Sequence, residues 1–247
     1  MKTVPLSRDG RVPLYYQIYD VLKEEIENGT YLPGSQIPSE AELGKRFNVS
    51  RITVKQAIQK LVVDGYLYRQ QGKGTFVSKP RVNRKLSELI SFHDEMLEKG
   101  FVPTSRILEF RVIPAQGVVA QALEVPENEK VIQIVRLRLA DDEVMAIQSS
   151  HVPYDLCPEL ANRRDQLTDS LYKLLKTEFN LVPATGRESY KAVVVRGKDA
   201  RILGVMDGSP AFSVRRYAYL EDGTPIEYAE SLLRADRYTL DVELKGV

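Results

Sequence analysis

Three helix-like stretches followed at once by two strand-like stretches restrict most strongly what the first third of this chain can fold into. Apolar side chains recur at i, i+3, i+4 and i+7 along the third stretch, the spacing that places them on one helix face: Val54, Ala57, Ile58 and Leu61. We expect this helix to begin at Ser50, whose hydroxyl can accept a free N–H of the first turn. The pattern predicts a helix with one apolar face and a polar first turn.

The neighbouring segments complete the arrangement. A first amphipathic helix is predicted from Pro13 to Asn28-Gly29, and Ser39 with Glu42 has the spacing of a capping box at the start of a short second helix. Residues 66–70 and 75–78 read as two strands joined by a glycine-bearing turn, Gln71-Gly72-Lys73-Gly74. The order helix, helix, tight turn, helix, hairpin predicts a winged helix-turn-helix.

The charge distribution suits such a module. Residues 1–80 carry 12 Lys+Arg and 8 Asp+Glu, a net charge of +4, whereas the remainder carries 23 and 26, a net charge of −3. At the start of the third helix, Arg51 can make a bidentate contact with guanine, and Thr53 can touch a thymine methyl group or a phosphate. Ser39 and Lys55 suit phosphates, and the glycines would let Lys73 approach a groove. We therefore expect binding to double-stranded DNA.

Residues 13–77 resemble the DNA-binding domain of the GntR family of bacterial transcription regulators. The segments P-S-E, S-R-x-T-V and G-x-G-T-F-V occur at the family's spacing, although many members carry Arg where this chain has Ala41. The resemblance implies a homodimer on a palindromic operator, because one module reads a half-site. It implies DNA contacts at the following positions: Ser39, Ser50, Arg51, Thr53, Lys55, Gln71, Gly72 and Lys73.

The chain beyond this module is expected to form a second domain. We predict a DNA-binding domain over residues 1–78, a polar, proline-interrupted linker over 79–85 and a second domain over 86–247. The second domain should open with a helix ended by Gly100 that turns these side chains inward: Leu86, Leu89, Phe92 and Met96.

A weak internal repeat lies within the second domain. Residues 118–150 resemble residues 199–231. At an offset of 80 Arg136 matches Arg216, and after one inserted turn residue Gln148 matches Glu227. Each copy reads as a short helix and a long β-hairpin, and a helix near 169–179 and a strand near 189–195 separate the copies. The pattern predicts a mixed α/β domain around an antiparallel sheet.

Residues 86–240 resemble the ligand-sensing (UTRA-type) domain of the HutC subfamily, which has a chorismate-lyase-like fold. The segments SFHDEM, VRLRLADDEVMAIQSSHVP, SLYKLL and EYAESLLRADRY carry the resemblance. The whole chain is thus expected to be α+β, and the resemblance implies a repressor that answers to a hexosamine phosphate. Whether ligand releases a repressor or favours an activator is left open at this point.

The residues themselves favour a phosphate site. Arg136 and Arg138 alternate to one face of a strand and could clamp a phosphate, while Ser170 and Tyr172 open the next predicted helix. Capping and surface salt bridges are the alternative roles. The full set of expected effector-binding residues is Ser91, Phe92, His93, Arg136, Arg138, Gln148, Ser170, Tyr172 and Glu227.

Two differences from hexosamine-phosphate sensors bear on the ligand. Those sensors tend to carry Glu at the position of Gln148 and Tyr at that of Leu233, and we expect both positions at the end of the pocket away from the phosphate. Loss of a carboxylate weakens recognition of an amine. We therefore expect a small phosphorylated sugar or related metabolite, with a non-phosphorylated metabolite as the alternative.

Other protein classes fit less well. His93 and His151, the only histidines, fall in different predicted elements, and Cys157 lacks an evident catalytic partner set, so a lyase-like enzyme is the weaker reading. No cofactor or metal motif is present, and no apolar run is long enough to span a membrane. A single cysteine fits a reducing cytoplasm, where we expect the protein to act.

Overall fold

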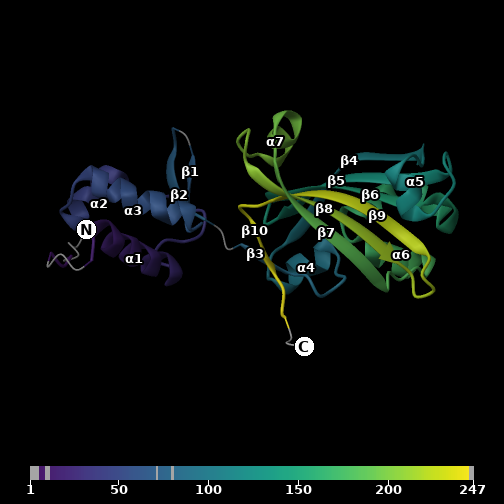
Figure 1. Ribbon diagram of the computed structural model, residues 1–247, viewed down its shortest axis with the longest axis horizontal. Coiled ribbons are helices and arrows are strands. Elements are labelled where there is room, and N and C mark those ends of the chain that lie inside the picture. The colour runs from purple at the N-terminus through teal and green to yellow at the C-terminus, as the bar shows by residue number, and fades with distance from the viewer. Residues whose placement is uncertain (1–5, 9–11, 71, 79–80, 245–247) are drawn as a thin grey trace. The chain divides into compact units, whose positions relative to one another are not determined.

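The computed structural model describes residues 6–8, 12–70, 72–78 and 81–244. The chain divides into two compact units, residues 1–80 and 81–247, which are coloured from purple to blue and from blue to yellow in Figure 1. The composition of helices and strands confirms the α+β class predicted from the sequence.

The first unit has the predicted order of three helices and a hairpin. Its elements are α1 (Leu14–Glu27), α2 (Glu40–Phe47), α3 (Arg51–Val63), β1 (Leu67–Gln70) and β2 (Gly74–Val77). The apolar stripe of α3 is fully buried and packs with α1, because Ile18 and Leu22 of α1 lie in the same core as Val54 and Leu61. Since one face of α3 forms the core, its opposite face is left to solvent.

The turn between α2 and α3 is tight for two local reasons. Asn48 ends α2 with φ at 51° and ψ at 52°, a left-handed conformation that asparagine tolerates better than most residues. Gly44 leaves room for the chain to return, since a Cβ there would come within 3.3 Å of the carbonyl oxygen of Val49. The turn delivers Ser50 to the start of α3.

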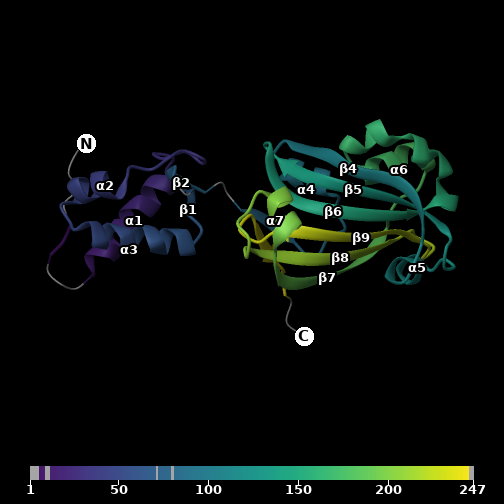
Figure 2. The same cartoon turned by 90° about the horizontal axis from the view of Figure 1, so that it is seen from above.

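The second unit is built on a six-stranded antiparallel sheet in the order β4-β5-β6-β9-β8-β7. Its strands are β4 (Pro103–Pro114), β5 (Lys130–Ala140), β6 (Glu143–Pro153), β7 (Thr185–Val194), β8 (Pro210–Tyr219) and β9 (Pro225–Arg234). Its helices are α4 (Phe92–Glu98), α5 (Val118–Leu123), α6 (Leu171–Phe179) and α7 (Gly197–Leu203), with three short 3-10 turns between 154 and 168. Figures 1 and 2 show α4 and α6 on one face of the sheet and α5 and α7 on the other.

The predicted repeat is confirmed and is longer than the sequence suggested. Each copy contains a strand, a helix and a hairpin: β4-α5-β5-β6 and β7-α7-β8-β9. The copies meet at β6 and β9, where Ser150 pairs with Ala229. Counting on from the match of Gln148 with Glu227, Ser150 and Ala229 are equivalent positions. The two halves are therefore related by an approximate twofold axis through this pair.

Two sequence predictions are wrong where the second unit begins. Residues 82–85, expected in the linker, form β3 (Val82–Lys85), which pairs in parallel with β10 (Tyr238–Asp241) near the chain's end. The helix expected from Leu86 begins only at Phe92, because Ser91 caps it there and accepts the N–H of Asp94 at 3.2 Å. A partner strand 156 positions away in the sequence leaves no local signal, so β3 resembled a linker.

Candidate functional site

The polar beginning of α3 is exposed, as predicted. Ser50 caps the helix by accepting the N–H of Thr53 at 3.3 Å, and the two hydroxyl oxygens lie 2.9 Å apart. The Arg51 side chain is 77% exposed, and its only ion pair among the described residues joins Nε to Glu40 Oε2 at 3.1 Å. Lys55 is also exposed. Arg51 is thus held at the surface and is not drawn into an internal salt bridge.

Other residues predicted to contact DNA have different surroundings. The hydroxyl of Ser39 donates to Glu42 Oε2 at 2.6 Å and accepts the Glu42 N–H at 3.3 Å, which confirms the capping box. Gly72 adopts a left-handed φ of 73°, and Lys73 is exposed. Gln71 lies outside the described residues. The wing therefore offers a cation at a turn that only glycine forms readily.

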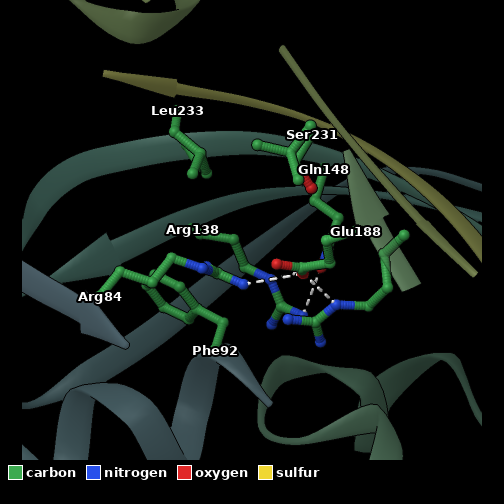
Figure 3. Close-up of a pocket in the computed structure, with 10 residues that line it drawn as sticks. Arg84, Phe92, Arg138, Gln148, Glu188, Ser231 and Leu233 are labelled. Atoms are coloured by element: carbon green, nitrogen blue, oxygen red, sulfur yellow. Dashed lines mark hydrogen bonds and ion pairs between the residues drawn. The ribbon is translucent and has the colours of Figure 1, made fainter. Parts of the chain in front are cut away.

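A pocket opens on the α4/α6 face of the large sheet, with a volume of about 390 Å³ including its mouth. Strands of both repeats and the segments next to them line it with mixed charged and apolar side chains: Arg84, Phe92, Arg138, Ala146, Gln148, Glu188, Val214, Arg216, Ser231 and Leu233. Figure 3 shows Arg84, Arg138 and Glu188 converging from different elements.

Arg136 and Arg138 of β5 point to the same face and are buried, with exposed fractions of 1% and 4%. Both donate to one neutral oxygen, Gln148 Oε1: Arg136 NH2 at 3.3 Å, and Arg138 Nε and NH2 at 3.0 and 2.7 Å. Arg138 also donates to the Ser105 hydroxyl at 2.9 Å. No carboxylate of the described residues is hydrogen-bonded to either guanidinium.

The charge of this pair is poorly compensated. Nε and NH1 of Arg136 are buried without a hydrogen-bond partner among the described residues. Burial lowers the pKa of Arg136 to about 10, against the opposing effect of nearby Glu227. Burial also lowers the pKa of Arg138 well below its usual range, and the charge of Arg136 adds to this. An anion between the two groups would supply the missing hydrogen bonds and the missing charge.

A second group of arginines, in contrast, is already neutralised. Glu188 Oε1 accepts from Arg84 NH2 at 3.0 Å and from Arg216 Nε at 2.5 Å. Arg84 NH1 also donates to buried Glu95 at 3.2 Å, and its Nε donates to the Tyr190 hydroxyl at 2.9 Å. Burial raises the pKa of Glu188, but Arg216 and Arg84 together lower it below its ordinary value. The two groups of arginines thus differ in how far carboxylates compensate their charge.

The predicted residues on the two helices lie near the arginine pair, but Ser91, Ser170 and Tyr172, like Arg136, are not among the residues that line the pocket. The capping hydroxyls of Ser91 in α4 and Ser170 in α6 are buried and hydrogen-bonded at 3.2 Å. Tyr172 donates to Glu227 Oε2 at 2.7 Å, and both lie near Arg136. Phe92 lines the pocket with its ring 5.3 Å from the Arg138 guanidinium, whereas half-buried His93 does not line it.

One placement was predicted wrongly, and three charged lining residues were missed, as were Ala146, Val214 and Ser231. Gln148 lies against the arginine pair rather than at the far end of the pocket, because register pairs it with Arg136 across β5 and β6. Leu233 does line the pocket away from that pair, beside Val214. Arg84, Glu188 and Arg216 were not predicted. The repeat offered a signal for Arg216, the equivalent of Arg136, but none for the other two.

Other kinds of site find little support in the described part of the chain. No group of three or more His, Cys, Asp or Glu there could hold a metal ion. His151 is buried in contact with Gln133 and Tyr228, and burial raises the pKa of the Cys157 thiol to about 12, so it is not a ready nucleophile. No helix within the described ranges is both long and apolar enough to cross a bilayer.

Family profiles match both units. The profile of bacterial regulatory proteins of the gntR family matches residues 14–77, and the UTRA domain profile matches residues 98–239. The two matches cover the helix-turn-helix with its wing and most of the unit that holds the pocket.

Named proteins match over nearly the whole chain. The HTH-type transcriptional repressor NagR of Bacillus subtilis (strain 168) is 37% identical over 95% of this chain and 96% of its own length. The mannosyl-D-glycerate transport/metabolism system repressor MngR of Escherichia coli (strain K12) is 30% identical over 93% of this chain and 95% of its own. The crystal structure of PhnF from Mycobacterium smegmatis shares the fold with a TM-score of 0.65 at 24% identity, covering 93% of this chain and 100% of that one.

Proposed function

Because the chain belongs to the gntR family of bacterial regulatory proteins and carries a UTRA domain, we propose that it is a dimeric transcriptional repressor released from its operator by a small phosphorylated metabolite. It is a transcription regulator rather than an enzyme. A sugar phosphate is the ligand class we favour. Because the family is bacterial and the proposed partner is DNA, we expect the protein to act in the cytoplasm. Two relatives that match over nearly the whole chain bear the name repressor, which supports this direction of control.

The proposed operator contacts rest on the exposed start of α3. Arg51 would read guanine in the major groove, Thr53 would meet a thymine methyl group or phosphate, and Lys55 would bind the backbone. Lys73 of the wing would add a further backbone contact. One such module reads one half-site, so a homodimer on a palindrome is part of the proposal.

The buried arginine pair that meets only neutral acceptors is the observation that carries the effector proposal. Arg136 and Arg138 share the amide oxygen of Gln148, and the hydroxyl of Ser170 marks the start of α6 beside them. Arg138 NH1 reaches the carbonyl of Asp169 at 3.5 Å, which brings this guanidinium to the N-terminus of α6. A phosphate there would gain two guanidiniums and a helix N-terminus.

The apolar side of the pocket restricts the rest of the ligand. Ala146, Val214 and Leu233 are buried there, and Ser231 is the polar residue beside them. The ligand therefore needs one strongly anionic end and a compact body with few groups to hydrogen-bond on this side. A sugar phosphate satisfies the first requirement; a non-phosphorylated acid is the rival, which a ligand panel separates.

The test is calorimetric titration of the full chain with glucosamine 6-phosphate, N-acetylglucosamine 6-phosphate, glucose 6-phosphate, the corresponding free sugars and gluconate. We expect binding by at least one phosphorylated compound and silence from its free sugar. Binding confined to gluconate would replace phosphate by carboxylate as the recognised group. Silence from every compound would overturn the sugar-phosphate proposal.

Arg136→Ala separates the effector site from DNA binding. Loss of one charge-assisted contact should weaken the binding phosphorylated compound by about 10- to 100-fold while leaving operator affinity unchanged. Operator release is measured by fluorescence anisotropy of a duplex selected by the parent protein. Arg106→Ala, at an exposed arginine of β4, is the matched control and should behave as the parent. Equal release from Arg136→Ala and the parent would remove Arg136 from the site.

A further inference from the structure

One carboxylate lies between the two arginines that the first unit presents beside the start of α3. Glu40 Oε2 is 3.1 Å from Nε of Arg51, and its other oxygen, Oε1, is 3.6 Å from NH2 of Arg69 in β1. Glu40 thus links three elements: α2, which it begins, the first residue of α3, and a strand of the wing. A carboxylate at this place repels the phosphates of DNA, the proposed partner, so its presence calls for an explanation.

Stabilisation of the fold does not explain why Glu40 is present. The side chains of Arg51 and Arg69 are 77% and 38% exposed, and exposed ion pairs typically contribute about 0–1 kcal/mol. The free N–H groups at the start of α2 do favour a carboxylate, but Glu42 already serves that helix end through the capping box. A neutral residue at position 40 would attract phosphates better than Glu40 does.

Geometry supplies a better reason. The ion pair with Glu40 engages Nε of Arg51, and among the described contacts the terminal nitrogens NH1 and NH2 of Arg51 have no partner. A guanidinium held at Nε presents its two terminal N–H groups end-on, which is the fork that guanine O6 and N7 accept. Without that hold, a side chain this exposed is free to bend toward the nearest phosphate.

We propose that Glu40 is a positioning residue that sets the sequence specificity of the DNA-binding unit. It fixes the direction of the Arg51 guanidinium toward a base edge and lowers the attraction of Arg51 and Arg69 for phosphates. The protein gives up non-specific affinity and gains discrimination between sequences. The role requires only operator binding, and is independent of which ligand occupies the pocket of the second unit.

The experiment begins with selection of binding sequences from a randomised duplex pool by the full chain. Parent and Glu40→Gln proteins are selected in parallel, and the chosen duplex and a scrambled one are then titrated at two salt concentrations. We expect Glu40→Gln to bind the scrambled duplex several-fold tighter and to lose about 10-fold in the ratio of specific to scrambled affinity, most of it at one guanine per half-site. The salt slope on scrambled DNA should steepen by about one unit for one added phosphate contact.

Four further proteins make the result decisive. Glu24→Gln removes the same charge from an exposed residue of α1 and should leave the specificity ratio unchanged. In an Arg51→Ala background, Glu40→Gln should cause no additional loss of discrimination, because Glu40 acts through Arg51. Glu40→Asp, which keeps a shorter carboxylate, should fall between parent and Glu40→Gln. Thermal midpoints confirm that each protein is folded.

An unchanged selected sequence and specificity ratio in Glu40→Gln would overturn the proposal. Additive losses in the double variant would also overturn it, since Glu40 would then act without Arg51. Failure of the parent itself to enrich any sequence would contradict operator binding, a different and distinguishable outcome.

Discussion

At the scale of single residues, Gln148 determines how much of the positive charge of the arginine pair is left for a ligand to neutralise. Its one amide oxygen accepts from two guanidiniums, so it spaces and orients Arg136 and Arg138 without neutralising them. An amide and a carboxylate have nearly the same shape but differ by a full charge. The neutral choice leaves the positive charge of the pair to be matched by a ligand, and the affinity for an anion depends on this.

Gln148→Glu tests this reading with little change in shape. A carboxylate would pair with both arginines, so we expect a higher thermal midpoint without ligand and at least about 10-fold weaker binding of the phosphorylated effector. The measurements are thermal unfolding of the full chain with and without inorganic phosphate, and calorimetric titration with the effector. Tighter binding by Gln148→Glu would show that position 148 recognises another part of the ligand.

At the scale of elements, caps made the first unit predictable and long-range pairing made the second less so. Ser39 and Ser50 begin α2 and α3 where the sequence predicts, because each cap is contained within four residues. The predicted repeat located β5, β6, β8 and β9. By contrast, β3 pairs with β10 near the end of the chain, and Arg84 reaches Glu188 across 104 residues of sequence. Strand alternation predicted that Arg136 and Arg138 share one face of β5. It did not predict that both donate to Gln148.

Ser39→Ala measures what the capping box contributes. Loss of the cap should destabilise α2 by about 1 kcal/mol, while Ser39→Asp keeps a capping oxygen and should stay close to the parent. Hydrogen exchange followed by mass spectrometry reports protection of the α2 amides in the full chain. Because Asp adds negative charge near DNA, Ser39→Asp should weaken operator binding despite a normal cap. Equal protection in Ser39→Ala and the parent would show that the cap contributes little.

At the scale of the whole molecule, Arg84 joins the pocket to the start of its unit. It lines the pocket and pairs with Glu95 and Glu188, yet it stands on β3, which begins directly after the boundary between the two compact units. A ligand that changed the position of Arg84 would act on the strand with which the second unit begins. A ligand can shift the equilibrium between two arrangements only by binding them unequally, and Arg84 is well placed to sense that difference.

Arg84→Lys tests this coupling while keeping the charge. Lysine lacks the planar fork that bonds Glu95, Glu188 and Tyr190 together, so we expect ligand binding to fall only a few-fold and operator release at saturating ligand to fall much further. Lys85→Leu changes the next, exposed residue of β3 and is the control. Calorimetry gives occupancy and anisotropy gives release. Normal release at equal occupancy would exclude Arg84 from the coupling.

The pairing of Ser150 with Ala229 has a consequence for how the ligand site arose. Two β-α-β-β halves joined about an axis through that pair are what fusion of two copies of one ancestral half produces. A perfectly symmetric ancestor would have had two identical mouths, each with its own arginine at the place of Arg136 or Arg216. Here Glu188 pairs directly with Arg216, whereas Arg136 has no hydrogen-bonded carboxylate among the described residues, so divergence between the duplicated halves made the site asymmetric and allows it to distinguish the two ends of a ligand.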